Sequence, residues 1–396
     1  MIRWRSADCA NVASPSAAAS LLERAIAERP ANALLRLKLA DLHLDRYDFA
    51  AAADALEKAL DIDAGLAGVR PRLGRCYNYL GRHERALAVL APVDSPDFQR
   101  ASAYAGLGLE AEAEREYRSL LAAEPGHRHA LRHLGKTLRR QGRIDELLDL
   151  CEALDAGGVG HSQLLYTWGT ALALAGRDAA ARAILFDRGR VAELALPVPE
   201  GFADIAEFNE ALADEILSNP YRLSDFPVED EANRGSSRVH ALFAGRRPEL
   251  VRALLASFQA LVDAHAPPRY DGFDPWIDAR PATAHIKAWG LIQRGDDYEE
   301  WHSHPGGWLS GVYYVRVPAS VSSEGPGCIE FGPPTALARA RAGYVEPWRH
   351  VPRPGFLLLA PSHYAHRTIP TGADEHRISF AFDVVPERRS VADTRS

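Results

Sequence analysis

Cysteine, long apolar runs and excess positive charge are all scarce in this chain of 396 residues. Its four cysteines lie too far apart for a disulfide framework or a zinc ribbon: Cys9, Cys76, Cys151 and Cys328. We therefore expect a reducing compartment, and hence a cytoplasmic location. No apolar run approaches the ~18 residues of a membrane-spanning helix. The N-terminal stretch has arginines but no sustained apolar segment, so neither a membrane segment nor a signal peptide is expected.

The charge balance argues against two classes of partner. With 46 Lys and Arg against 53 Asp and Glu, the formal net charge is −7, which argues against nucleic acid or an anionic membrane. The G-x-S-x-G motif of hydrolases and the G-x-x-x-x-G-K motif of phosphate-binding loops do not occur. What is present is a globular composition, 47% hydrophobic, at a length that predicts two or three domains.

The first half of the chain is repetitive. Residues 14 to about 190 are rich in Ala, Leu, Arg and Glu, which favours helix. Glycines in helix-breaking contexts are spaced by 27, 34 and 34 residues: Gly81, Gly108, Gly142 and Gly176. Seven residues before three of them lie glycines at which two antiparallel helices are expected to approach closely: Gly74, Gly135 and Gly169. After each turn a small or apolar residue precedes a larger one by four positions: Ala52/Leu56, Ala86/Leu90, Ala113/Tyr117, Leu147/Cys151 and Ala181/Leu185.

This half resembles the tetratricopeptide-repeat family, whose period is 34 residues, with one shortened repeat at 94–127. The resemblance implies a curved solenoid whose concave groove holds a peptide or a protein segment. A non-repetitive helical bundle is the alternative. Basic residues of the first helices could line the groove and favour an acidic partner, or form only a solvated helix face: Arg70, Arg72, Arg75, Arg132 and His133.

The pattern of residue types changes near residue 195, where the helical repeats end. Two prolines and a glycine in 194–202 predict a linker. Amphipathic helices are expected in 203–220 and 248–266, and beyond Pro267 the chain becomes a series of short apolar or alternating runs bounded by Gly, Pro, Asp and Ser. We therefore predict an all-helical repeat array (14–193), a linker (194–202), an antiparallel β sandwich or barrel with supporting helices (203–386) and a disordered tail (387–396).

The densest chemical signal is the segment YEEWHSHPGGWLSGVYYVRVP. His302 and His304 are two residues apart, just before a predicted strand at 309–317, and in an extended chain both point to the same face. A second strand, GFLLLAP, is followed by His363 and His366. Two close histidines and a distant third can form a facial metal site, with open positions that suit catalysis by Fe(II).

The ordered blocks GFADIAEFNEALA, HSHPGGWLSGVYYV and PSHYAH, followed by R-x-S, resemble the 2-oxoglutarate- and Fe(II)-dependent oxygenases of the prolyl-hydroxylase-like branch. The likeness covers roughly residues 200–386. It implies a double-stranded β-helix of the jelly-roll or cupin-like kind, with Fe(II), 2-oxoglutarate and O2 as cofactor and cosubstrates.

The resemblance also implies roles for individual residues. His302 and His366 are the two histidine ligands, with His363 as a rival for the second. Arg377 binds the distal carboxylate of 2-oxoglutarate, and Ser379 and Tyr314 add hydroxyl donors. A surface ion pair is the alternative role for the arginine.

His304 departs from the family pattern. The usual third ligand is an aspartate or glutamate, so a site with three histidines is one charge more positive and is expected to hold Fe(II) less tightly. We take His304 as the third metal ligand. Two alternatives stay open: Glu299 or Glu300 supplies a carboxylate, or His304 binds substrate.

The remaining aromatic residues near these blocks are expected to be structural. Tyr313 should point away from Tyr314 into the core. Trp289 and Trp308 could flank a substrate pocket, but core packing is the expectation for both.

Together these features predict an Fe(II)- and 2-oxoglutarate-dependent dioxygenase that hydroxylates a peptide, a protein or a small molecule, with the repeat array binding a partner or the substrate. One alternative is a catalytically inactive scaffold. Another is a three-histidine metal dioxygenase that does not use 2-oxoglutarate, against which the R-x-S pattern argues.

Overall fold

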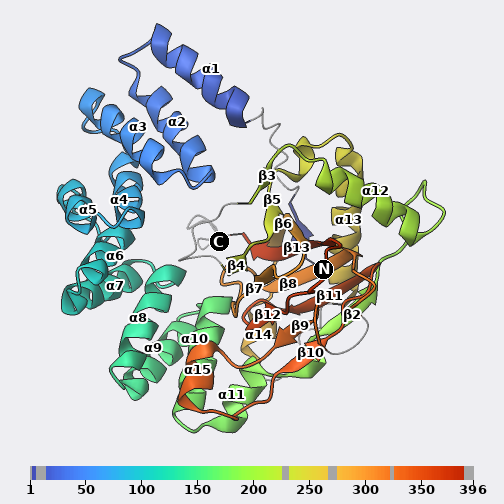
Figure 1. Ribbon diagram of the computed structural model, residues 1–396. Coiled ribbons are helices and arrows are strands. Elements are labelled where there is room, and N and C mark those ends of the chain that lie inside the picture. The colour runs from blue at the N-terminus through green and yellow to red at the C-terminus, as the bar shows by residue number, and fades with distance from the viewer. Residues whose placement is uncertain (1, 6–14, 225–231, 266–273, 322–324, 388–396) are drawn as a thin grey trace. The chain divides into compact units, whose positions relative to one another are not determined.

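The computed structural model describes residues 2–5, 15–224, 232–265, 274–321 and 325–387 (Figure 1). It divides into two compact units: Val12–Arg143, and Met1–Asn11 together with Ile144–Ser396. The division between the units therefore falls earlier in the chain than the change of pattern near residue 195. The tail predicted at 387–396 lies, from residue 388 on, outside the described residues.

The predicted helical repeats are confirmed. The first unit consists of helices α1 (Pro15–Glu28), α2 (Ala33–Asp45), α3 (Phe49–Ile62), α4 (Val69–Tyr79), α5 (His83–Leu90), α6 (Phe98–Gly106), α7 (Glu110–Ala123) and α8 (Arg128–Arg140). The series continues in the second unit with α9 (Ile144–Ala156), α10 (Ser162–Leu174) and α11 (Asp178–Leu185). The four turn glycines adopt positive φ angles, as the sharp turns between paired helices require: Gly81 (67°), Gly108 (74°), Gly142 (71°) and Gly176 (78°).

Packing within the helical pairs follows the small-residue pattern of the sequence. A Cβ atom on Gly74 would lie 2.8 Å from the side chain of Leu90, and one on Gly169 would lie 2.5 Å from that of Leu185. The ten paired residues that follow the turns are all buried: Ala52, Leu56, Ala86, Leu90, Ala113, Tyr117, Leu147, Cys151, Ala181 and Leu185. The pairs α4–α5 and α10–α11 therefore close over a glycine, and the residues after each of the five turns are buried.

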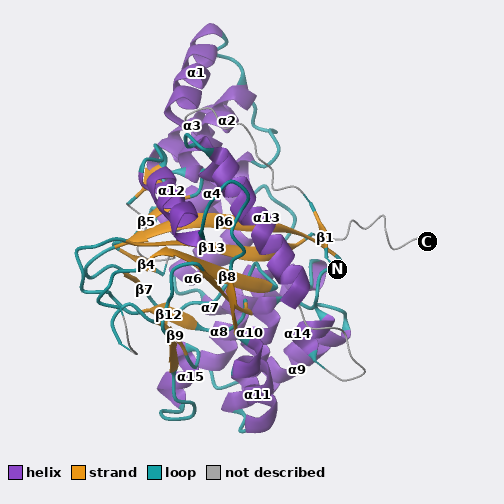
Figure 2. Cartoon of the chain, turned by 90° about the vertical axis from the view of Figure 1, so that its right-hand side faces the viewer, coloured by secondary structure: helices purple, strands orange, loops and turns teal. Residues whose placement is uncertain are grey.

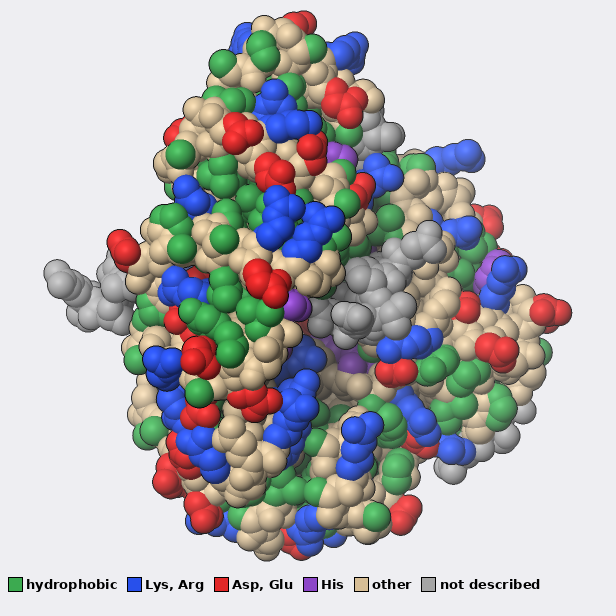
Figure 3. All heavy atoms as spheres, turned by 60° about the vertical axis from the view of Figure 1, so that its left-hand side comes forward, with side chains coloured by type: hydrophobic (Ala, Val, Ile, Leu, Met, Phe, Trp, Pro, Cys, Tyr) green, Lys and Arg blue, Asp and Glu red, His purple; other side chains and the backbone are tan. Residues whose placement is uncertain are grey.

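The basic residues expected near the groove make contacts within the repeats. Arg72 forms an ion pair with Asp41 at 2.8 Å, and Arg70 donates a hydrogen bond to a backbone carbonyl of α5. The guanidinium of Arg75 lies over the ring of Phe49. On the face shown in Figure 3, basic and acidic side chains are interspersed over the helices. These contacts favour the reading of a charged helix face that stabilises the array.

The second unit contains the predicted β domain. Its largest sheet has the strand order β2-β11-β8-β13-β6-β5-β3, with β1 beside β6. The strands of this sheet are β1 (Arg3–Trp4), β2 (Ala192–Ala195), β3 (Arg222–Leu223), β5 (Ser237–Val239), β6 (Thr283–Gln293), β8 (Leu309–Arg316), β11 (Phe356–Pro361) and β13 (Arg377–Pro386). Two smaller sheets accompany it, one of β10 (Trp348–His350), β9 (Ile329–Phe331) and β12 (His366–Thr368), the other of β4 (Asn233–Arg234) and β7 (Tyr298–Glu299).

The large and the three-stranded sheets share an apolar core. Tyr314 of β8 and Leu358 of β11 pack in one buried cluster with Ile329 and Phe331 of β9. All strand pairs are antiparallel except that of β1 with β6. Two antiparallel sheets closing over one core form a double-stranded β-helix, which confirms the predicted fold class of a tetratricopeptide-like array followed by such a domain.

Helices support the outer face of the large sheet. Phe258 of α13 (Pro248–His265) stacks on Phe382 of β13 at 4.5 Å. The hydroxyl of Tyr313 donates to Asn209 of α12 (Ile205–Leu217), so this tyrosine faces the core as expected. Figure 2 shows both helices beside the strands of this sheet. Short helices α14 (Pro275–Asp278), α15 (Thr335–Ala340), η1 (Arg188–Arg190) and η2 (Leu242–Ala244) complete the unit. None of the helices that the structure describes is long and apolar enough to cross a membrane.

The last pair of repeat helices is joined to the β domain by buried polar contacts. The hydroxyl of Ser162, in α10, donates to the carbonyl of Gly307 at 2.6 Å. His363 contacts the carbonyl of Ile184, in α11, at 2.8 Å. Strand β2, which begins before the predicted linker, adds an edge strand to the large sheet. Helices α10 and α11 are therefore part of the same compact unit as the β sheets.

The close approach of α4 and α5 at Gly74 gives a stability prediction. Gly74→Ala is expected to lower the free energy of unfolding by about 1 to 2 kcal/mol. The steric clash of the new Cβ with Leu90 should cost more free energy than the higher helix propensity of alanine contributes. The urea midpoint followed by far-UV circular dichroism measures this change. Gly126→Ala, where a Cβ meets no atom within 4 Å, is the matched control and should stay within about 0.5 kcal/mol. Equal midpoints would contradict the packing argument.

Candidate metal centre and cosubstrate pocket

Three histidines from two distant segments converge in the β domain. His302 and His304 lie between β7 and β8, and His366 begins β12. His302 and His366 exchange two backbone hydrogen bonds of 2.9 Å, and the backbone N–H of His304 donates to the carbonyl of Ser362. One ligand atom from each histidine lies within 4.8 Å of the other two. Backbone pairing thus sets the three imidazoles around one point.

The hydrogen bonds of these imidazoles select the atom that faces this point. The Nδ1 atoms of His302 and His366 lie 2.7 and 3.0 Å from the backbone carbonyls of Glu300 and Tyr364. The Nδ1 of His304 lies 2.6 Å from a carboxylate oxygen of Asp383. Because carbonyl and carboxylate oxygens only accept, each Nδ1 must carry the proton. The lone pair of each Nε2 is then left for a metal ion.

Burial and neighbouring charges set the protonation of the cluster. Burial lowers the pKa of His302, and burial together with the two neighbouring histidines lowers the pKa of His366 well below its usual value. For His304, burial also acts to lower the pKa, but the attraction and hydrogen bond of Asp383 outweigh it and raise the pKa. His302 and His366 are therefore held neutral, the form in which imidazole binds metals.

The two glutamates considered as alternative ligands differ in position. An Oε2 atom of Glu299 lies 3.7 Å from Nε2 of His302, while its Oε1 accepts a hydrogen bond of 2.7 Å from Arg238. Glu300 instead pairs with Arg234 through its side chain. Glu299 is thus a buried carboxylate beside the histidines whose charge is paired with an arginine, and Glu300 contributes only its backbone carbonyl to the cluster.

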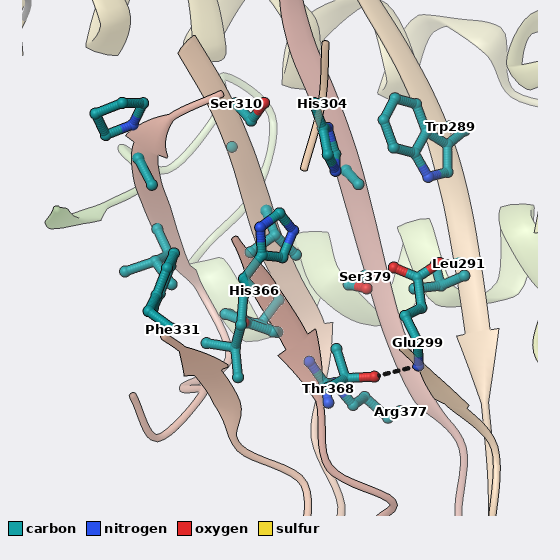
Figure 4. Close-up of a pocket in the computed structure, with 18 residues that line it drawn as sticks. Trp289, Leu291, Glu299, His304, Ser310, Phe331, His366, Thr368, Arg377 and Ser379 are labelled. Carbon is teal, nitrogen blue, oxygen red and sulfur yellow. Dashed lines mark hydrogen bonds between the residues drawn. The ribbon is translucent and has the colours of Figure 1, made fainter. Parts of the chain in front are cut away.

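The three residues expected to bind 2-oxoglutarate line a pocket that also includes His304 and His366. Arg377 and Ser379 are two residues apart on β13, and Ser379 lies opposite Tyr314 of β8 in the strand register. Figure 4 shows Arg377 and Ser379 in this pocket with the two histidines. The arginine is 2% exposed, so the alternative of a surface ion pair is wrong.

Polar atoms of these three residues are buried without a partner. Among the described residues, Nε of Arg377, Oγ of Ser379 and Oη of Tyr314 make no hydrogen bond. Burial raises the pKa of Tyr314 to about 12, although Arg377 acts to lower it, so its hydroxyl keeps the proton it would donate. A buried donor without a partner costs about 1–3 kcal/mol. The pocket is therefore lined by three residues with buried donors that can bind an acceptor.

His363, the rival for the distal histidine position, lies elsewhere. It is fully buried, and its Nε2 contacts the carbonyl of Ile184. Burial lowers its pKa to about 3, so it is a neutral core residue. The structure brings His366, and not His363, to the cluster.

The two tryptophans have different surroundings. Trp308 is buried and stacks on Trp276 at 5.1 Å, as expected of a core residue. Trp289 lines the pocket, with its ring 5.7 Å from that of His304. The expectation that Trp289 packs in the core was wrong, because its position in β6 directs it to the pocket face of the sheet.

The sequence interpretation missed Asp383 and the residues around it. Asp383 accepts hydrogen bonds from His304 and from Ser310. It lies on the same face of β13 as Arg377 and Ser379, since alternate residues of a strand share a face. Polar residues at alternate positions of an otherwise apolar strand were the signal that could have found it.

Comparisons with known proteins match two parts of the chain. Residues 287–383 match the family model described as "Putative 2OG-Fe(II) oxygenase", and residues 43–110 match that of a tetratricopeptide repeat. The match to the repeat family thus lies ahead of the match to the oxygenase family in the chain. No curated protein matches it.

Solved structures resemble parts of the chain at low identity. A prolyl-4-hydroxylase from Pseudomonas putida is 16% identical over 50% of this chain and 94% of its own, with a TM-score of 0.34. A prolyl hydroxylase from Trichoplax adhaerens, in complex with a hypoxia inducible factor peptide fragment, is 13% identical over 50% of this chain and 84% of its own, with a TM-score of 0.36. YrrB, a tetratricopeptide-repeat protein with an unusual peptide-binding site, is 19% identical over 43% of this chain and 95% of its own, with a TM-score of 0.34.

The positions of the two rival histidines give a second prediction. His366→Ala should abolish Co(II) binding and cost less metal-free stability than His363→Ala, because His366 is only partly buried and lines the pocket, where water can replace its hydrogen bond to the Tyr364 carbonyl. His363→Ala should keep metal binding but lose about 2–4 kcal/mol of stability, since it leaves a cavity and an unpaired carbonyl. Anaerobic Co(II) titration and urea unfolding measure the two effects. Loss of metal in His363→Ala alone would make that residue the ligand.

Proposed function

We propose that this protein is an Fe(II)- and 2-oxoglutarate-dependent dioxygenase that hydroxylates an organic substrate. The observation that carries the proposal is the set of three buried, unpartnered donors on Arg377, Ser379 and Tyr314, in one pocket with the histidine cluster. A dicarboxylate with a 2-oxo acid at one end fits these two requirements, because one end meets the donors while the other meets a metal.

The donor set suits the metal that the family implies. His302, His304 and His366 would hold Fe(II) through three Nε2 atoms, a set of ligands that leaves positions open for small molecules. When bound, the iron supplies the O2 chemistry that couples oxidative decarboxylation of 2-oxoglutarate to hydroxylation of the substrate. The chain itself contributes the ligand geometry and a largely apolar pocket.

The cosubstrate end of the pocket is built for a carboxylate. The guanidinium of Arg377 offers its Nε while its Nη1 is fixed by the carbonyl of Gly327 at 2.9 Å. The hydroxyls of Ser379 and Tyr314 add two neutral donors. Ile329 and Leu358 line the pocket and strengthen these bonds by excluding water.

For the substrate, we propose a peptide or protein side chain, with a small molecule as the alternative. The support is the attached repeat array, because tetratricopeptide repeats form peptide-holding grooves and a tethered target would have a raised local concentration. A cytoplasmic location is supported by the free thiols of Cys76, Cys151 and Cys328.

Arg377 gives the sharpest test of cosubstrate binding. Arg377→Met should weaken 2-oxoglutarate binding about 10- to 150-fold, the equivalent of one lost charge-assisted hydrogen bond of roughly 1.5–3 kcal/mol. Anaerobic titration of the Fe(II)-loaded protein, followed by the metal-to-ligand charge-transfer band, measures the dissociation constant. Arg316→Met is the matched control, because Arg316 lies on the neighbouring strand and pairs with Glu210 at the surface. Equal effects of both variants would remove Arg377 from the site.

Succinate formation tests turnover itself. The wild-type protein with Fe(II), 2-oxoglutarate and O2 should release succinate, and His302→Ala should not, because it lacks one of the three imidazoles. Metal and 2-oxoglutarate binding without succinate from any candidate peptide would favour the inactive scaffold. Consumption of O2 without any need for 2-oxoglutarate would favour a three-histidine dioxygenase of another kind.

A further inference from the structure

His304 differs from the other two histidines in what holds its ring. The Nδ1 atoms of His302 and His366 donate to neutral backbone carbonyls. The Nδ1 of His304 donates to the carboxylate of Asp383 at 2.6 Å. His304 is also the residue that occupies the position at which the resembled oxygenases have a carboxylate ligand. The carboxylate of Asp383 therefore contacts the Nδ1 atom of His304, which is the histidine that departs from the family pattern.

The charge of Asp383 is directed at His304. The side chains of both residues are 12% exposed, and in the described part of the chain Asp383 forms its ion pair with His304 alone. Lys287, its register neighbour on β6, is exposed to solvent. The other carboxylate beside the cluster, Glu299, forms an ion pair of 2.7 Å with Arg238. Of the two, only Asp383 has its charge uncompensated by an arginine.

A closed circuit of contacts fixes this pair. Ser310 lies opposite Asp383 in the strand register and donates to it at 2.7 Å. The hydroxyls of Ser310 and Ser362 are 2.7 Å apart, and the carbonyl of Ser362 accepts the backbone N–H of His304. The circuit therefore holds both the backbone and the ring of His304.

A glycine makes room for the circuit. A Cβ atom on Gly307 would lie 2.5 Å from Oγ of Ser362 and 3.1 Å from Cβ of Asp383. The carbonyl of this glycine is in turn held by Ser162 of α10. The approach of Asp383 to His304 is thus built into the local backbone.

We propose that Asp383 is a positioning residue that holds His304 as the third metal ligand and supplies, one hydrogen bond behind it, the negative charge that the H-x-H sequence lacks. The proposal rests on the proposed function, since it requires a metal at the three histidines. A carboxylate on the Nδ1 proton makes Nε2 a stronger donor and fixes the ring orientation. In the usual site one carboxylate ligand both completes the geometry and neutralises charge. Here His304 would complete the geometry and Asp383 would supply the negative charge.

Co(II) binding to the full-length protein tests this division without any need for turnover. Asp383→Asn keeps a side-chain oxygen but removes the charge, and it should weaken Co(II) binding about 10- to 100-fold and shift the visible d–d bands. Glu215→Gln is the matched control, because it removes the charge of another buried carboxylate, which lies on α12 and accepts a hydrogen bond from the backbone N–H of Arg247. It should leave the Co(II) affinity unchanged.

A second pair of variants tests whether the effects of residues 304 and 383 on Co(II) affinity depend on each other. This comparison does not require that Asp383→Asn folds as a single variant. His304→Asp would place a new carboxylate against Asp383, and the two like charges should repel. The double variant His304→Asp with Asp383→Asn removes this repulsion and places the charge directly on the metal. It should therefore bind Co(II) more tightly than His304→Asp and recover most of the affinity lost in Asp383→Asn.

The outcomes separate the two proposals. If the wild-type protein does not bind Co(II), the proposed function fails and the role of Asp383 fails with it. If the wild-type protein binds Co(II) and Asp383→Asn binds it equally tightly, the role of Asp383 is overturned while the metal site stands. Tighter binding by His304→Asp than by the double variant would overturn it as well, and loss of affinity in Glu299→Gln instead would assign the charge to that residue.

Discussion

The pairing of strand β13 on both of its edges is the constraint on which the site depends. One edge is hydrogen-bonded to β6 and the other to β8, so the register of β13 is fixed along almost its whole length. Arg377 and Ser379 then line the pocket, Asp383 lies on the same face of the strand and contacts His304, and Phe382 faces α13 on the opposite side. A slip of one residue would reverse every one of these directions. The buried donors of Arg377 and Ser379 and the partner of His304 are therefore set by the same strand register.

The double pairing also explains how the pocket tolerates polar groups without partners. Three buried donors without acceptors would cost several kcal/mol together at about 1–3 kcal/mol each. The surrounding strands offset this cost, because Phe380 and Tyr313 pack in the apolar layer on the other face of the same strands. A bound ligand would then accept the hydrogen bonds that the folded chain leaves unmade, as in other preorganised sites.

Much of this arrangement could be predicted from the sequence, and the remainder has a physical reason for being hidden. The spacing of Gly108, Gly142 and Gly176 marks the repeats because each turn needs a positive φ angle. The order of the histidine and R-x-S blocks indicated which distant segments meet. The pairing of His304 with Asp383 was hidden, because the alternation of polar residues on β13 marks the face of Asp383 but not the residue, 79 positions away, that it contacts. Trp289 was misplaced for a different reason, since its aromatic ring suggested core packing although its face of β6 also carries Lys287 and Gln293, while the apolar face runs from Ala284 to Ile292.

Helices α10 and α11 are attached to the loops that carry the histidines. This attachment limits where the repeat array could be exchanged for that of another chain. Ser162 holds the loop that follows His304, and Ile184 holds His363 in the loop that precedes His366. An exchange of repeat arrays between related chains would therefore disturb the histidine site if the crossover were made after α11, whereas a crossover ahead of α9 would carry both supports along with the β domain. The final pair of repeat helices is in this sense part of the scaffold of the histidine site.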